Sequence, residues 1–258
     1  GKCKAMRAID DSSVRAAIRA AIDAGHEEAV HAVAYHDGKM VLNIWDGLAD
    51  PANGTPAAAD TLYNVYSVTK AVAATALHIQ AEKGYVDYDA PIADYWPEFA
   101  QNGKASATVR HALTHRAGVP LMPDGVTPER MCDSDWMASA IAAMEPLAPP
   151  GEKTLYQSMT FGWIIGEIVK RTDPKHRDLN TFVQEEIAAP LGLADLWIGI
   201  PDAVANRVAV MKKVRAIEVP VKTRKTDDSD RPITAAKAQK AICAVAADIA
   251  WMRNEKKK

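Results

Sequence analysis

The chain of 258 residues has little cysteine. It contains three cysteines, Cys3, Cys132 and Cys243, which lie far apart and include no C-x-x-C pair. Zinc sites and dense disulfide frameworks depend on closely spaced cysteines. The sequence therefore supports neither, and we expect the three thiols to be reduced.

Long apolar runs and a strong excess of one charge are also missing. No apolar run approaches the length of a membrane span, and residues 1–25 lack the apolar centre of a signal peptide. A formal net charge of -2 gives no electrostatic reason to expect nucleic acid or an anionic membrane as a partner. We therefore expect a soluble globular protein of the cytoplasm.

The first quarter of the chain carries an amphipathic helix and a hairpin. Val14, Ile18 and Ile22 share one face of a helix expected over residues 12–24. Strands are predicted over residues 29–35 and 40–45, because the Asp-Gly pair between them suits a tight hairpin turn. A loop of small residues should follow, over residues 46–60.

The rest of the chain is mostly helical in pattern. Helices are expected over residues 68–83, 108–116, 133–144, 158–170 and 179–188. Beyond residue 200 the pattern weakens, and we expect strand-like patches within 206–220, a charged loop over 222–231 and a helix over 234–253.

The first chemical candidate is Ser67-Val68-Thr69-Lys70, the only S-x-x-K in the chain. In the first turn of a helix this spacing puts the hydroxyl and the amine on one face, where the amine can take the hydroxyl proton. The helix N-terminus would also favour an oxyanion. The alternative is that Ser67 caps the helix and Lys70 is solvated.

The second candidate is Tyr156, on the loop that follows Pro149-Pro150-Gly151. A phenol beside an ammonium has a lowered pKa, so Tyr156 could share the proton of Ser67 with Lys70. The alternative is a loop aromatic that only packs.

Four groups of residues occur in a fixed order. They are Ser67-Val68-Thr69-Lys70, the stretch Thr108 to Val119, the stretch Pro150 to Ser158 with Phe161 to Val169, and Pro190-Leu191-Gly192-Leu193. Together they resemble the serine β-lactamase-like family, in the branch that holds class C β-lactamases, family VIII esterases and D-Ala-D-Ala carboxypeptidases. The resemblance runs from about residue 28 to residue 254.

The resemblance implies an α+β fold, with an antiparallel sheet flanked by helices and a mostly helical region that carries the site. Residues 1–60 would supply the N-terminal helix and hairpin of the α/β part. Residues 61–200 would form the mainly helical region with the catalytic motifs, and residues 201–258 would return toward the α/β part.

The resemblance also implies roles for five residues. Ser67 would be the nucleophile, with its N–H as half of an oxyanion hole, and Lys70 and Tyr156 would share the general-base and general-acid work. Ser158 would stand where the family often has asparagine and help to position the lysine. Gln157, between the two, is grouped with Ser158 as a substrate-binding or positioning residue.

No cofactor or metal is expected. His111 and His115 have the i, i+4 spacing of a metal pair. The resemblance instead implies that both histidines are structural.

One part of the family pattern is not identified. The third motif, a Lys-Thr-Gly, His-x-Gly or Trp-x-Gly on the strand across the cleft, is not recognised in this chain. Residues 241–252 resemble the family helix that precedes the last strands, so we expect an incomplete sheet with exposed edges and without the second oxyanion donor.

The sequence thus predicts a serine hydrolase that cleaves a carboxylic ester, or a related acyl compound, through a Ser67 acyl-enzyme. An ester is preferred because Ser158 replaces the amide. A catalytically impaired relative or fragment with a structural or interaction role is the first alternative, and a β-lactamase or D-amino-acid peptidase the second. The expected partners are a small acyl substrate and, to cover sheet edges, a second copy of the chain.

Overall fold

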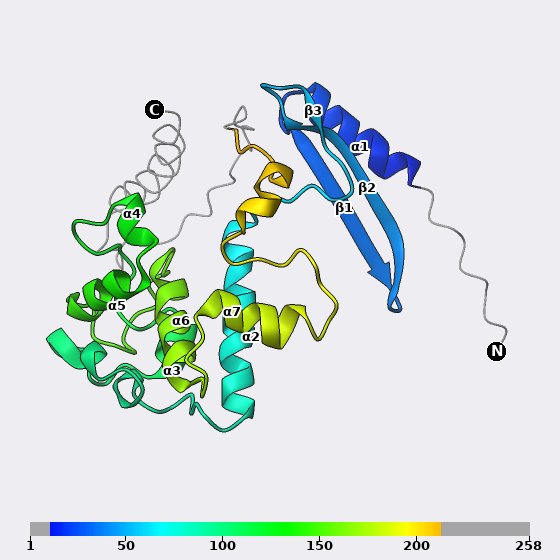
Figure 1. Cartoon of the computed structure of the whole chain (residues 1–258). Helices are drawn as coiled ribbons and strands as arrows, with labels where there is room; N and C mark the ends of the chain where they lie inside the picture. Colours follow the sequence, from blue (N-terminus) through cyan, green and yellow to red (C-terminus); the bar gives the residue numbers. More distant parts are fainter. Residues whose placement is uncertain (1–10, 213–258) are drawn as a thin grey trace, which may run out of the picture. The chain divides into compact units, whose positions relative to one another are not determined.

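The computed structural model describes residues 11–212 (Figure 1). Within them the chain forms two compact units. The first unit contains residues 11–65 and 200–212, and the second contains residues 66–199. Each unit is described by itself.

The first unit is a helix packed on an antiparallel hairpin. Helix α1 (Ser12–Asp23) lies along strands β1 (Ala29–His36) and β2 (Lys39–Asp50), and the short β3 (Thr55–Pro56) pairs with β2 (Figure 1). The predicted turn between β1 and β2 is confirmed, with Asp37 and Gly38 both at positive φ.

Strand β2 is longer than the sequence predicts, since it continues through the first residues of the expected loop to Asp50. Gly47 pairs with Ala29 at a φ of 96°. A Cβ at position 47 would lie 2.2 Å from the carbonyl oxygen of Glu28. Glycine therefore serves here as a close-approach residue inside a strand, and not as the start of a loop.

The second unit is built from helices and single turns. In chain order they are a 3-10 turn at Tyr66–Val68, α2 (Thr69–Glu82), 3-10 turns at Ile92–Asp94 and Pro97–Gly103, α3 (Val109–Leu113), α4 (Pro128–Met131), α5 (Ser134–Ala143), α6 (Thr160–Thr172), α7 (Leu179–Val183) and a π-turn at Gln184–Ala188. All five predicted helices are present, and α4 was not predicted.

Helix α3 ends earlier than expected, and its limits have local causes. The side chains of Thr108 and His111 bond each other's backbone N–H groups at the helix start. His115 has a φ of 59°, a left-handed conformation that turns the chain out of the helix. The predicted end at residue 116 was therefore wrong by three residues.

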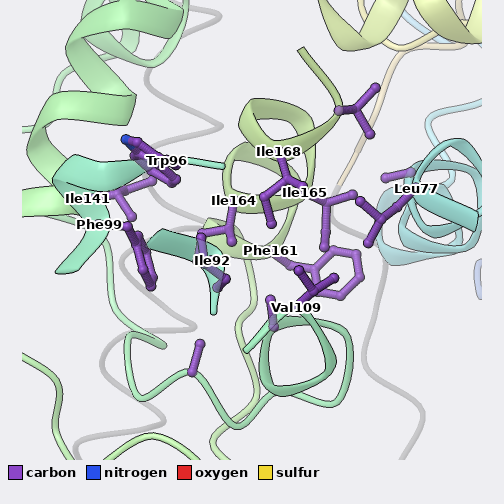
Figure 2. Close-up of a cluster of buried hydrophobic side chains, with 14 of the residues drawn as sticks. Leu77, Ile92, Trp96, Phe99, Val109, Ile141, Phe161, Ile164, Ile165 and Ile168 are labelled. Atoms are coloured by element: carbon purple, nitrogen blue, oxygen red, sulfur yellow. The ribbon is translucent and has the colours of Figure 1, made fainter. Parts of the chain in front are cut away.

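The core of the second unit is arranged around α6. Figure 2 shows its residues Ile164, Ile165 and Ile168 between Leu77 of α2 on one side and Trp96 and Phe99 on the other. All of these are almost fully buried. Burying a large apolar side chain stabilises a fold by about 1.5–3 kcal/mol, so this packing fixes α2 against α6.

The last part of the chain is described only to residue 212. Within 202–212 the structure has a 3-10 helix at Asp202–Arg207 and one parallel bridge, between Val208 and Leu62, so residues 206–212 do not form one of the expected strand patches. The rest of that expected stretch, residues 213–220, lies outside the described residues. The expected loop over 222–231 and helix over 234–253 lie outside the described residues. None of the helices between residues 11 and 212 combines the length and apolar character needed to cross a membrane.

Candidate active site

Ser67 lies in the 3-10 turn Tyr66–Val68, directly before α2. The residue that caps α2 is Val68, whose side chain is apolar, so Ser67 is not the helix cap that the alternative interpretation proposed. Its hydroxyl is exposed at the positive end of a helix of 14 residues.

Three side chains meet at the Ser67 hydroxyl. The Tyr156 hydroxyl donates to Ser67 Oγ at 2.8 Å, and Lys70 Nζ donates to the same oxygen at 2.9 Å. Lys70 and Ser67 are joined by helical spacing, but Tyr156 is 89 residues further along the chain. The structure thus brings together the three residues that the sequence singled out.

The ammonium of Lys70 is held by more than this contact. It donates to the backbone carbonyl of Ser158 at 2.6 Å, and it lies 5.0 Å from the ring centre of Tyr156 and 6.0 Å from that of Phe161. Cations favour the faces of aromatic rings at such distances. The alternative of a lysine extended into solvent is therefore wrong.

The pKa of Tyr156 lies below the ordinary phenol value of 10.0. The main cause is the hydrogen bond with Ser67, and the neighbouring Lys70 ammonium lowers the pKa further against an opposing effect of burial. The phenol is half-exposed, so its ionised form remains hydrated. A base with this environment is suited to accept a hydroxyl proton.

The residue before Ser67 is conformationally unusual. Tyr66 has a φ of 46°, in the left-handed region that a bulky residue rarely occupies. Residues in such conformations cost about 1–3 kcal/mol and concentrate at functional sites. Nothing in the sequence marks this position, because tyrosine carries no preference for positive φ.

Neither the Ser158 nor the Gln157 side chain forms a hydrogen bond with Ser67, Lys70 or Tyr156 in the described structure. Ser158 contacts Lys70 through its backbone carbonyl, which any residue could supply. The side chain of Gln157 is fully buried, and its amide atoms have no hydrogen-bond partner within the described part of the chain. Its backbone N–H donates to Nδ1 of His115 at 3.2 Å.

His115 is a neighbour of the site. Its ring centre lies 4.7 Å from that of Tyr156 and 5.2 Å from that of Phe161. His111, by contrast, bonds to the backbone at the start of α3. Among residues 11–212, no three His, Cys, Asp or Glu side chains are placed to hold a metal ion.

The letters Trp-x-Gly and His-x-Gly do occur in the chain. His36-Asp37-Gly38 and Trp45-Asp46-Gly47 belong to the hairpin and precede Ser67, whereas the family's third motif follows the tyrosine. Trp197-Ile198-Gly199 follows Tyr156 but lies in a bend, not in a strand. Up to residue 212, the described chain has no strand after Tyr156 that could carry the motif.

Sequence comparisons find a β-lactamase family model and relatives that are described as esterases or β-lactamases. A family model described as Beta-lactamase matches residues 14–253. Esterase/beta-lactamase LipL of Mycobacterium tuberculosis is 39% identical over 176 residues, covering 68% of this chain and 40% of that protein. Esterase EstB of Burkholderia gladioli is 29% identical over 225 residues, covering 78% of this chain and 55% of that protein.

Solved structures agree with these relatives. A penicillin-binding protein homolog from Caulobacter crescentus is 38% identical with a TM-score of 0.71, and covers 81% of this chain and 56% of that one. A family VIII carboxylesterase is 36% identical with a TM-score of 0.73, and covers 81% and 57%. The predicted α+β fold is thereby confirmed. The chain spans about half the length of the relatives that it matches.

Proposed function

Because the chain belongs to the β-lactamase family, we propose that it is a serine hydrolase that cleaves a carboxylic ester through an acyl-enzyme on Ser67. One observation carries the proposal, namely that the Tyr156 hydroxyl and the Lys70 ammonium both bond to the Ser67 hydroxyl. A weak nucleophile needs a base within hydrogen-bond reach, and Tyr156 can supply it once ionised, with the Lys70 ammonium beside it.

In the proposed acylation, ionised Tyr156 accepts the proton of Ser67 while Oγ attacks the ester carbonyl. The Lys70 ammonium supports the phenolate before the transfer, because it lowers the pKa of Tyr156. The carbonyl oxygen becomes an oxyanion near the N-terminus of α2, where backbone N–H groups and the helix dipole stabilise negative charge.

Collapse of the tetrahedral intermediate breaks the bond to the alkoxy group, which leaves as an alcohol with the proton held by Tyr156. Water then attacks the acyl-enzyme, its proton passes to Tyr156, and the proton returns to Ser67 as the acid is released. The first and last proton transfers run directly between Tyr156 and Ser67, whose hydroxyl oxygens are 2.8 Å apart.

An ester is the preferred substrate class for two reasons. The residue two positions after Tyr156 is Ser158 and not an amide residue. In addition, EstB is described as an esterase and one solved relative as a family VIII carboxylesterase, while LipL is described as an esterase/beta-lactamase. The experiment below therefore also measures β-lactam hydrolysis, as the competing activity.

Fluorophosphonate labelling and a p-nitrophenyl acetate burst test the proposal. We expect wild type to take up the label and to release a burst stoichiometric with chains. Ser67→Ala should abolish both, and Ser139→Ala, at an exposed serine of α5, should leave both unchanged. Equal labelling of wild type and Ser67→Ala contradicts the proposal, and turnover of a chromogenic cephalosporin faster than any ester would move the substrate class to β-lactams.

A further inference from the structure

His115 bonds to both chain neighbours of Tyr156. The backbone carbonyl of His115 accepts the N–H of Leu155 at 2.8 Å, and its Nδ1 accepts the N–H of Gln157 at 3.2 Å. The imidazole ring also packs against the Tyr156 ring. A single residue therefore contacts Tyr156 itself and fixes the peptide groups before and after it.

The ring of His115 must be neutral to accept this bond. With Nδ1 as the acceptor, the hydrogen of neutral imidazole lies on Nε2. Burial lowers the pKa of His115, and the nearby Lys70 ammonium lowers it further. In the described chain, the titratable side chains next to this ring are Lys70 and Tyr156. Burial and the charge of Lys70 favour the uncharged imidazole.

The remainder of the tyrosine loop is anchored elsewhere. The carbonyl of Gly118 accepts the N–H of Leu147, and that of Arg116 accepts the N–H of Gly151, both at 2.8 Å. The Arg116 guanidinium donates to the carbonyl of Gly151. These bonds do not involve the imidazole, so its removal should loosen the chain at Tyr156 without detaching the loop as a whole.

We propose that His115 is a positioning residue that holds the Tyr156 phenol against Ser67, acting through the Nδ1 bond to Gln157 and through ring packing. The expected effect of His115 on catalysis rests on the proposed function. The position of the Tyr156 phenol does not, and it can be tested without an activity measurement. The proton-accepting geometry at Ser67 is sensitive to displacement, since an error of about 1 Å can cost about a hundredfold in rate.

Two substitutions separate the parts of this role. His115→Leu keeps apolar bulk and removes the acceptor. His115→Asn places an oxygen at the same branch position as Nδ1 and tolerates the left-handed backbone, so it should restore the bond to Gln157. His78→Asn, at an exposed histidine of α2, is the matched control.

The direct readout is a tyrosine ring NMR titration of the full 258-residue chain, with Tyr156→Phe assigning the resonance. In wild type, His115→Asn and His78→Asn the pKa of Tyr156 should stay below 10.0. In His115→Leu it should rise toward that ordinary value, because the phenol leaves Ser67 and Lys70. An unchanged Tyr156 titration in His115→Leu overturns the proposal.

Ester kinetics provide the second readout. His115→Leu should lower kcat by about 10- to 100-fold with KM within about twofold, and His115→Asn should recover most of the loss. A parallel loss in both variants would mean that the ring supports the fold alone and would also count against the proposal. If wild type is not labelled by fluorophosphonate, the hydrolase proposal fails, while the Tyr156 titration still decides the positioning role.

Discussion

Lys70 Nζ and the backbone carbonyl of Ser158 are 2.6 Å apart, and this bond links α2 to the segment that leads into α6. The two residues are 88 positions apart in sequence. Leu77 on α2 and Ile165 on α6 are fully buried in one core, so apolar packing brings the two segments together. The site geometry is therefore a consequence of core packing as much as of the S-x-x-K spacing.

Lys70 and Ser158 should respond very differently to substitution. Lys70→Met removes the ammonium that lowers the pKa of Tyr156 and should reduce kcat for an ester by at least about a hundredfold. Ser158→Ala keeps the carbonyl and should change kcat by less than about threefold, measured under the same conditions. A large loss in Ser158→Ala would show that its hydroxyl takes part in the chemistry.

Tyr156 should set the alkaline dependence of the reaction. Its ionised form is the proposed base, so kcat/KM should rise with pH and level off above the pKa of Tyr156, which lies below 10.0. Tyr156→Phe should lower the plateau by about 10²- to 10⁴-fold and abolish this rise. The pH–rate profiles of the two proteins provide the measurement, and an identical rise in Tyr156→Phe would assign the base elsewhere.

His115 should make stability depend on pH. Burial lowers its pKa in the folded chain below the ordinary 6.5, so the unfolded chain binds the proton more readily. Stability is therefore full above 6.5 and falls as the pH drops from 6.5 toward the folded pKa. Urea unfolding at about pH 7.5 and about pH 5 should give a smaller difference for His115→Asn than for wild type. Equal differences would contradict a partly buried, neutral imidazole at position 115.

The sequence predicted the chemical residues better than the contacts between them. Helical spacing alone places Ser67 beside Lys70, and this relation is local. The link from Tyr156 to both depends on packing between distant segments, which no local pattern encodes. The resemblance implied only a structural role for His115. Its contact with the Gln157 N–H could not be predicted, because it depends on the left-handed turn that ends α3.

For secondary structure too, local patterns predicted some elements and missed others. Periodicity located α5, and the structure shows the side chain of Asp133 capping it by accepting the N–H of Trp136. Composition misassigned residues 46–50, since a glycine suits a loop as well as a crowded strand position. Helix α4 is four residues long, too short for a periodic apolar face to be read.

Lys104 should be a stability residue of the second unit. It is fully buried, and its Nζ donates to the carbonyls of Gln101 and Ala142 at 2.8 and 2.9 Å and to that of Met144. Two of these groups lie at the C-terminal end of α5, where helix carbonyls lack partners. Lys104→Met should lower the free energy of unfolding by about 2–4 kcal/mol in urea titrations. Lys175→Met, at an exposed lysine, is the control, and an equally small effect in both would contradict the role.

Gly47 and Gly25 form a matched pair that separates crowding from backbone strain. Both have positive φ, 96° and 71°, but a Cβ at Gly25 would meet nothing within 4 Å, whereas one at Gly47 would overlap the Glu28 carbonyl. Gly25→Ala should therefore cost only about 1 kcal/mol, the strain of a left-handed alanine. Gly47→Ala must also displace β1 from β2, and we expect it to cost at least about 2 kcal/mol more in urea unfolding. Similar losses for the two variants would mean that the strands can separate at Ala29 without penalty, and that Gly47 is needed only for its φ.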